Sequence, residues 1–214
     1  MFSLENIEKY INEYDGNHSI LMRLIESRII EFAKDKRSGF HEDEWYMFYG
    51  FLLFEDDYFR IKKDIILNDL KEDILDVGCQ FGFQSEIFKG SNKYIGLDVY
   101  KFYFNQDDKN VEYRTGLFPN KNIDISDKIV ISNMSLGYFN QFLDKTYRYG
   151  DEAVSLSDTD LMLIDELSKA KILYCTSRPI FIEELKGRFN NFKWIGCSLD
   201  SVGNISVGVY KFWN

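Results

Sequence analysis

The sequence has few of the residues that most often carry metal-dependent or nucleophilic catalysis. Its 214 residues include only two histidines and three cysteines. Cys79, Cys175 and Cys197 are far apart and lack the C-x-x-C spacing of a zinc site. We therefore expect reduced thiols and no disulfide framework. The acidic cluster at residues 41–44 has no further ligand at a suitable spacing, so we interpret it as the start of a solvated helix and expect no metal site.

Long apolar runs and clusters of positive charge are also missing. No run approaches the roughly 20 apolar residues that span a bilayer, and the acidic segment Met1 to Tyr10 does not resemble a signal peptide. The chain has 26 basic and 35 acidic side chains, a formal net charge of −9. Such a charge is repelled by phosphate backbones and anionic membranes. These observations favour a cytoplasmic protein with neither a membrane nor a nucleic-acid partner, and they leave the oligomeric state open.

Proline is equally scarce, and its two positions help to divide the chain. Pro119 and Pro179 each follow a candidate strand, where we expect a loop. Apolar residues recur at helical spacing through the first 70 residues, beginning with Leu4, Ile7 and Ile11. We predict a helical cap over residues 1–70 and a second domain over residues 71–214.

Short apolar runs alternate with helical patterns after residue 70. Runs rich in β-branched residues suit strands buried on both faces of a parallel sheet. The expected strands cover residues 74–77, 94–97, 111–115, 128–131 and 171–175. The expected helices cover residues 84–89, 137–149 and 158–169. This alternation predicts an α/β fold with right-handed crossovers and a doubly wound, mainly parallel sheet.

The tail of the chain departs from that alternation. A helical pattern over residues 181–189 is followed by two strand patterns, over residues 192–199 and 205–213. The connection between them is short, and a short connection forces the two strands to pair antiparallel. The sequence therefore predicts a parallel sheet that ends in a C-terminal antiparallel hairpin.

A glycine loop after the first of these strands is the most informative motif. Asp76 ends an apolar run, Gly78 and Gly82 follow, and Asp98 ends the next strand. Ligands of open α/β sheets bind beyond the carboxyl ends of the strands, and a carboxylate there can accept hydrogen bonds from both ribose hydroxyls. The spacing D-x-G-x-x-x-G disfavours a dinucleotide fingerprint and excludes a phosphate-binding P-loop.

The loop resembles motif I of the class I S-adenosylmethionine-dependent methyltransferases, D/E-x-G-x-G-x-G. The pattern maps onto Asp76, Gly78, Gln80 and Gly82, and the acid of motif II maps onto Asp98. The resemblance covers residues 70–214 and implies a seven-stranded sheet with a reversed last strand, preceded by helices that cap the active site. It also implies S-adenosylmethionine as cofactor. The implied cofactor-binding set is Asp76, Gly78, Cys79, Gln80, Phe81, Gly82, Asp98, Val99 and Asn133, with Trp45, Ser135 and Tyr138 as candidates for contact with the methyl acceptor.

The sequence departs from the family pattern at three places. Gln80 replaces the middle glycine, and residues 113–117 at the end of the third strand include no acid to hold the adenine amino group. Asn133 lacks the two prolines of the motif in base-methylating enzymes. The resemblance therefore implies a small-molecule, sugar or protein acceptor rather than a nucleic-acid base. The alternative is a catalytically degenerate member that serves as a ligand-binding or accessory protein. No general base can be named.

Overall fold

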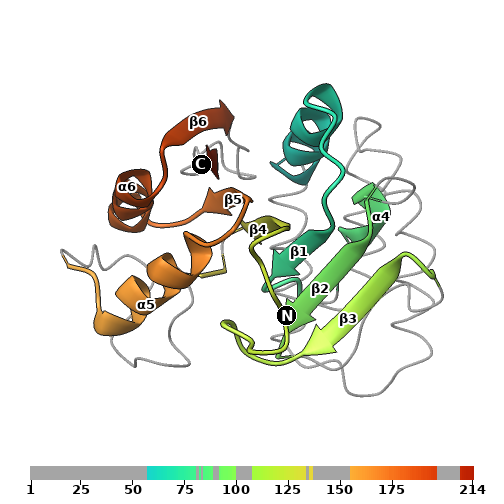
Figure 1. Cartoon of the computed structure of the whole chain (residues 1–214), viewed down its shortest axis with the longest axis horizontal. Helices are drawn as coiled ribbons and strands as arrows, with labels where there is room; N and C mark the ends of the chain where they lie inside the picture. The colour runs from blue at the N-terminus through green and yellow to red at the C-terminus, as the bar shows by residue number, and fades with distance from the viewer. Residues whose placement is uncertain are drawn as a thin grey trace, which may run out of the picture. The chain divides into compact units, whose positions relative to one another are not determined.

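A seven-stranded sheet organises the part of the chain that the structure describes. The computed structural model describes residues 57–80, 82, 84–88, 92–99, 108–133, 135–136, 155–196 and 208–214. The strands are β1 (Ile74–Val77), β2 (Tyr94–Asp98), β3 (Val111–Thr115), β4 (Ile129–Asn133), β5 (Ile172–Thr176), β6 (Asn191–Gly196) and β7 (Val209–Trp213). The described helices are residues 57–67, α4 (Ser85–Phe88), α5 (Asp158–Leu167) and α6 (Pro179–Arg188) (Figure 1).

The strand order is β3-β2-β1-β4-β5-β7-β6. Strands β1 to β5 pair in parallel, whereas β7 pairs antiparallel with both β5 and β6. This arrangement confirms the predicted α/β fold, with its mainly parallel seven-stranded sheet and its antiparallel hairpin at the C-terminal end. Each predicted strand is present, and the bounds differ by a few residues at most where the residues are described.

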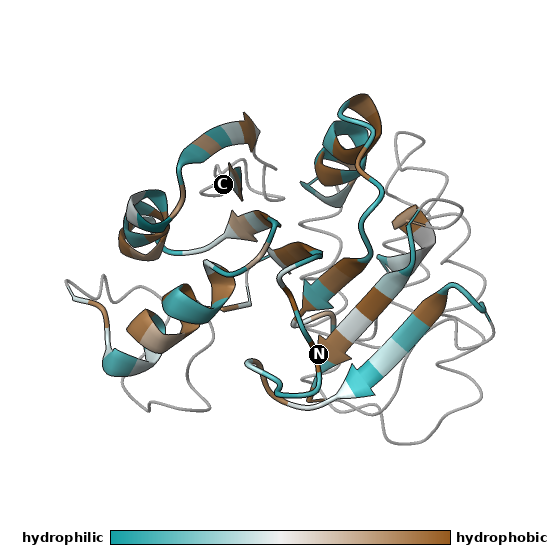
Figure 2. Ribbon diagram, in the orientation of Figure 1, coloured by the Kyte–Doolittle hydropathy of each residue, from teal (hydrophilic) through white to brown (hydrophobic). Residues whose placement is uncertain are grey.

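The central strands are buried on both faces, as their continuous apolar runs predict. Every residue of β1, β2, β4 and β5 is buried. Along each strand the side chains alternate between two faces. On one face, Leu75, Val130 and Leu173 join the core with α5 and α6, and we call this the α5–α6 face. Strand β3 at the sheet edge is only partly buried, and Figure 2 shows it as more hydrophilic than β1 and β2.

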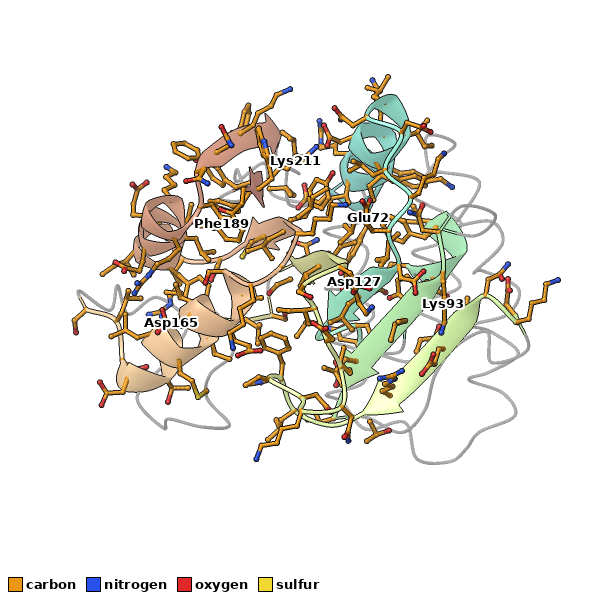
Figure 3. The ribbon with its side chains drawn as sticks, viewed as in Figure 1. Glu72, Lys93, Asp127, Asp165, Phe189 and Lys211 are labelled. Atoms are coloured by element: carbon orange, nitrogen blue, oxygen red, sulfur yellow. The ribbon has the colours of Figure 1, made fainter. Side chains whose placement is uncertain are left out.

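Residues 57–67 form a helix that packs on the opposite face, which we call the 57–67 face. Its buried stripe consists of Tyr58, Ile61 and Ile65. Asp64 of the same helix accepts hydrogen bonds from Lys211 Nζ at 2.6 Å and from Tyr174 Oη at 2.7 Å (Lys211 is labelled in Figure 3). Burial opposes ionisation of Asp64, but the two hydrogen bonds and the charges of Lys211 and Lys193 together lower the pKa of the carboxyl.

The predicted helical cap falls mostly outside the described residues. Residues 1–56 lie outside the described residues, and so does the helix expected over residues 137–149. The described helix at residues 57–67 lies within the predicted cap and packs against the sheet. The division of the chain at residue 70 stays a prediction.

Local sequence signals explain where α5 and α6 begin. In α5, Ser157 Oγ accepts the backbone N–H of Asp160, and the Asp160 side chain accepts the backbone N–H of Ser157, so both residues satisfy exposed helix-end donors. Pro179 is the first residue of α6, so the expected loop at that position is wrong. Proline suits the first helical position because its missing N–H would have no partner there.

Candidate functional site

The carboxyl ends of the parallel strands bring the predicted residues to one edge of the sheet. β1 is followed by Gly78, β2 ends in Asp98 and β4 ends in Asn133. The strand order reverses between β1 and β4, because β2 and β3 lie on one side of β1 while β4 and β5 lie on the other. Ligands of open α/β sheets bind at such a switch point. We call this edge the carboxyl edge.

The loop after β1 uses left-handed backbone at every second residue. Gly78, Gln80 and Gly82 have φ angles of 76°, 52° and 73°. These are the three positions at which motif I has glycine, because a residue without Cβ adopts this conformation at no steric cost. Gln80 adopts it with a side chain, which costs roughly 1–2 kcal/mol. The backbone therefore has the form of the motif even where its middle glycine is replaced.

The two glycines make room for side chains of the protein itself. A Cβ atom at Gly78 would collide with Ser135, and one at Gly82 would collide with the ring of Tyr113. Tyr113 Oη also donates to the carbonyl of Gly82 at 3.1 Å, and Ser135 Oγ donates to the carbonyl of Val77 at 2.6 Å. Gly82 thus allows close packing of the loop and α4 on the sheet, the part played by the last glycine of a dinucleotide-binding loop.

Asp76 lies beneath this loop in a buried hydrogen-bond network. Its Oδ2 accepts the Tyr94 hydroxyl at 2.6 Å and the Gln84 amide at 2.7 Å, and Gln84 Nε2 also donates to the Cys79 carbonyl at 3.0 Å. The second oxygen, Oδ1, has no hydrogen-bond partner among the described residues. Burial raises the pKa of Asp76 to about 7, and the nearby Asp98 adds to this, while the two hydrogen bonds act in the opposite direction.

Gln84, Tyr94 and Tyr113 hold the loop in place, and sequence reasoning missed all three. Tyr94 stacks on Phe88 of α4 with ring centroids 5.9 Å apart. The sequence did carry a signal for them. Tyr94 and Tyr113 place hydroxyl groups in strands that were expected to be buried, and Gln84 places an amide at the start of the expected helix. A buried hydroxyl or amide needs a partner, and the acid at the end of β1 provides one.

Asp98 is the last residue of β2, and exposed apolar side chains lie next to it. Its Oδ2 accepts the backbone N–H of Gln80 at 2.7 Å, and its carbonyl accepts the N–H of Gly116 at 2.8 Å. Val99 and Leu117, which follow Asp98 and Gly116, are 44% and 55% exposed. A carboxylate bordered by exposed apolar side chains fits a ribose and the flat base attached to it. Leu117 was not among the predicted residues.

Cys79 and Asn133 are both buried at this edge. Burial, followed by the charges of Asp76 and Asp98, raises the pKa of the Cys79 thiol well above its usual value, so Cys79 is a packed thiol rather than a nucleophile. Asn133 lies at the end of β4, and Ser135 lies just beyond it against Gly78. Trp45, Phe81 and Tyr138 fall outside the described residues.

The described part of the chain has neither a metal-binding cluster nor a membrane-spanning helix. In it, no group of three or more His, Cys, Asp or Glu side chains is placed to hold a metal ion. No helix there has the length and apolar character to cross a membrane.

Comparison with solved structures identifies the fold. The chain is similar to a candidate O-methyltransferase from Nostoc punctiforme PCC 73102, with a TM-score of 0.50 and 9% identity over 80% of this chain and 60% of that one. It is also similar to WbdD (TM-score 0.49, 16% identity, 73% of this chain and 39% of that one). A third match is the E. cuniculi Mtq2–Trm112 complex (TM-score 0.47, 14% identity, 74% of this chain and 95% of that one). No protein-family model and no curated protein matches the sequence.

The chain therefore has the class I methyltransferase fold, as the resemblance at motif I implies. The conclusion rests on the strand order with its reversed β7 and on the Nostoc structure. At these identities the likeness concerns the fold alone.

Proposed function

We propose that this protein is an S-adenosylmethionine-dependent methyltransferase that acts on a small molecule, a sugar or a protein in the cytoplasm. The observation that carries the proposal is the position of Asp98 beside the Gly78–Gly82 turn, at the carboxyl edge and next to the switch point between β1 and β4. A carboxylate at this place suits the ribose hydroxyls of an adenosyl compound.

The residues of the site fit such a cofactor at its adenosine end. Asp98 would hold the ribose, and the exposed side chains of Val99 and Leu117 would border the adenine. Backbone contacts would hold the adenine amino group, since residues 113–117, at the end of β3, include no acidic side chain to do so. Gly78, Gln80 and Gly82 would bring the loop backbone near the amino-acid end, with the side chain of Gln80 beside it.

Bound S-adenosylmethionine supplies an electrophilic methyl group on its sulfonium. The protein then has to hold the acceptor in line with that methyl group and keep water away, and these two effects can provide much of the rate enhancement. A general base is needed only for a weakly nucleophilic acceptor. The scarcity of histidine is compatible with this chemistry.

Titration calorimetry with S-adenosylmethionine and with its demethylated product tests the cofactor. Saturable binding of both compounds is the expected result, and a protein that binds neither would contradict the proposal. Transfer of a radiolabelled methyl group to components of a cell extract then distinguishes an enzyme from a protein that only binds the compound.

A second function is favoured by a specific observation. Ser135 and Tyr113 occupy the space that a side chain at Gly78 or Gly82 would need, and Asp98 already accepts a hydrogen bond from the loop. A degenerate member that acts as an accessory or ligand-binding protein would retain this internal packing after losing the cofactor. Absence of binding in both titrations would favour that alternative.

A further inference from the structure

Two buried polar side chains at the carboxyl edge have unused hydrogen-bonding capacity. Asn133 is the last residue of β4, Thr176 is the last residue of β5, and the two are register partners in adjacent parallel strands. Their exposed fractions are 9% and 0%. Among the described residues, neither the amide nitrogen nor the amide oxygen of Asn133 has a hydrogen-bond partner, and the Thr176 hydroxyl has none either.

Such groups are unusual inside a protein. The great majority of buried polar side-chain atoms are hydrogen-bonded, and each one left without a partner costs about 1–3 kcal/mol. Here three such atoms lie on two neighbouring residues at the ligand-binding edge of the sheet. Their common position indicates that a bound group completes their hydrogen bonds.

The pleat of the sheet places both side chains on the 57–67 face. Leu173 and Cys175 belong to the α5–α6 core, so Thr176, which is out of phase with them, points to the other face, as Tyr174 does. Asn133 follows the same rule relative to Val130. β5 lies three strand spacings from β2, which is about 14 Å. Thr176 is therefore well separated from the ribose position at Asp98, on the other side of the switch point, and Asn133 lies one strand nearer to it.

The chemistry of the pair limits what it can bind. The Asn133 amide donates and accepts, the Thr176 hydroxyl donates and accepts, and neither carries charge. Neighbouring polar side chains have partners: Ser177 Oγ donates to the Leu136 carbonyl at 2.8 Å, and Arg178 pairs with Asp160 at 2.9 Å. A charged ligand group would lose its hydration without gaining a counter-charge from the pair. An uncharged group that both donates and accepts is the complement.

We propose that Asn133 and Thr176 together bind a hydroxyl or carboxamide group of the methyl acceptor and so determine its specificity. The family resemblance implied a contact of Asn133 with the cofactor, and this proposal assigns its side chain to the acceptor instead; Thr176 was not among the residues predicted from the sequence. The assignment of the ligand as an acceptor rests on the proposed methyl transfer. The preference of the pair for an uncharged group does not depend on methyl transfer, because it follows from the burial, the free donors and acceptors and the lack of charge of the two side chains.

Acetamide, acetate and methylammonium are probes of similar size that test this preference in the full chain. Nuclear magnetic resonance would follow the side-chain amide of Asn133 and the methyl group of Thr176 as each probe is added. Acetamide should shift both signals in a saturable way, and each charged probe should bind at least about tenfold more weakly. Equal binding of the charged probes, or no saturable shift with acetamide because ordered water remains in place, would overturn the inference.

A matched pair of variants separates the site from general effects on the fold. Thr176→Val keeps the shape and removes the hydroxyl, and it should weaken acetamide binding about fivefold, the size expected for one lost hydrogen bond. Thr159→Val makes the same change in the first turn of α5, the helix that packs on the opposite, α5–α6 face of the sheet, and should leave binding unchanged. Unchanged acetamide binding by Thr176→Val, with a folded spectrum, would remove Thr176 from the site.

Calorimetry with S-adenosylmethionine on the same sample keeps the two proposals distinguishable. If the protein binds acetamide but not S-adenosylmethionine, the methyltransferase proposal fails. Asn133 and Thr176 would then still bind an uncharged group, but that group would not be a methyl acceptor. If it binds S-adenosylmethionine but not acetamide, only the inference about Asn133 and Thr176 fails.

Discussion

The backbone N–H of Gln80 lies 2.7 Å from Asp98 Oδ2, and Gln80 adopts left-handed backbone to make this hydrogen bond. The bond joins the glycine loop of β1 to the acid at the end of β2 across 18 residues of sequence. At least one carboxylate oxygen of Asp98 therefore fixes the loop. A ligand that uses Asp98 meets a carboxylate whose position is already set.

Asp98→Ala should weaken binding of S-adenosylmethionine by about 1.5–3 kcal/mol, the range for hydrogen bonds to charged groups. Asp98→Asn is the control, since its amide oxygen can still accept the Gln80 N–H and so separates loop anchoring from ligand binding. Calorimetric titration of the three proteins gives the comparison. An Asp98→Ala protein that is folded and binds as well as the original would exclude Asp98 from the site.

Gln80→Gly should raise the free energy of unfolding by about 1 kcal/mol, because glycine adopts a φ of 52° without the steric cost paid by glutamine. Gln80→Ala keeps the Cβ atom and should bring no such gain. Urea denaturation measures both variants. Equal stability of the glycine and alanine variants would show that the left-handed conformation at residue 80 carries little strain.

Asp76 should make the protein less stable as the pH rises toward 7. Its folded pKa of about 7 lies above the ordinary aspartate pKa of 3.8, so the folded state binds more protons than the unfolded state between these two pH values. Stability falls with rising pH wherever the folded state holds the extra proton. The contribution of Asp76 is thus fully present below about pH 4 and lost as the pH passes about 7.

Asp76→Asn provides the comparison for that pH dependence. Its side chain can still accept from Tyr94 and Gln84 but does not titrate. Urea denaturation at several pH values between 5 and 8 should give a flatter profile for the variant. Parallel profiles for the two proteins would mean that Asp76 does not change its protonation in this range.

Gly82→Ala should destabilise the fold by about 2 kcal/mol or more, since the added methyl group collides with the Tyr113 ring and the backbone there has a φ of 73°. Gly187→Ala in α6 is a matched control, because a Cβ atom there meets nothing within 4 Å. That variant should be more stable by about 0.5–1 kcal/mol, the helix preference of alanine over glycine. Thermal or chemical denaturation distinguishes these opposite signs, and a loss at both positions would argue against the specific contact with Tyr113.

The sheet was predictable from the sequence because its strands are short apolar runs separated by recognisable breaks. β1, β2, β4 and β5 are buried on both faces, so their apolar runs are continuous, and the short connection after β6 required an antiparallel partner. The loop geometry was also accessible, because left-handed backbone at residues 78 and 82 calls for glycine.

Contacts between side chains that are far apart in the sequence were not predictable in the same way. Tyr113 reaches Gly82 from 31 residues away and Lys211 reaches Asp64 from 147 residues away. No periodicity within a strand encodes which distant residue its side chain will meet. The amide of Asn133 and the hydroxyl of Thr176, which have no hydrogen-bond partner among the described residues, were not predictable for the same reason, since an unused hydrogen-bonding group is visible only when its surroundings are known.

The place of β7 has a consequence for the last strand of the sheet. β7 lies between β5 and β6 although it follows both along the chain, so β6 joins the sheet only through β7. β6 exposes Phe192 and Trp194 even in the finished fold. Any partly folded state in which β7 is detached therefore also frees β6, and presents an aromatic strand with an unpaired edge that can associate with other chains.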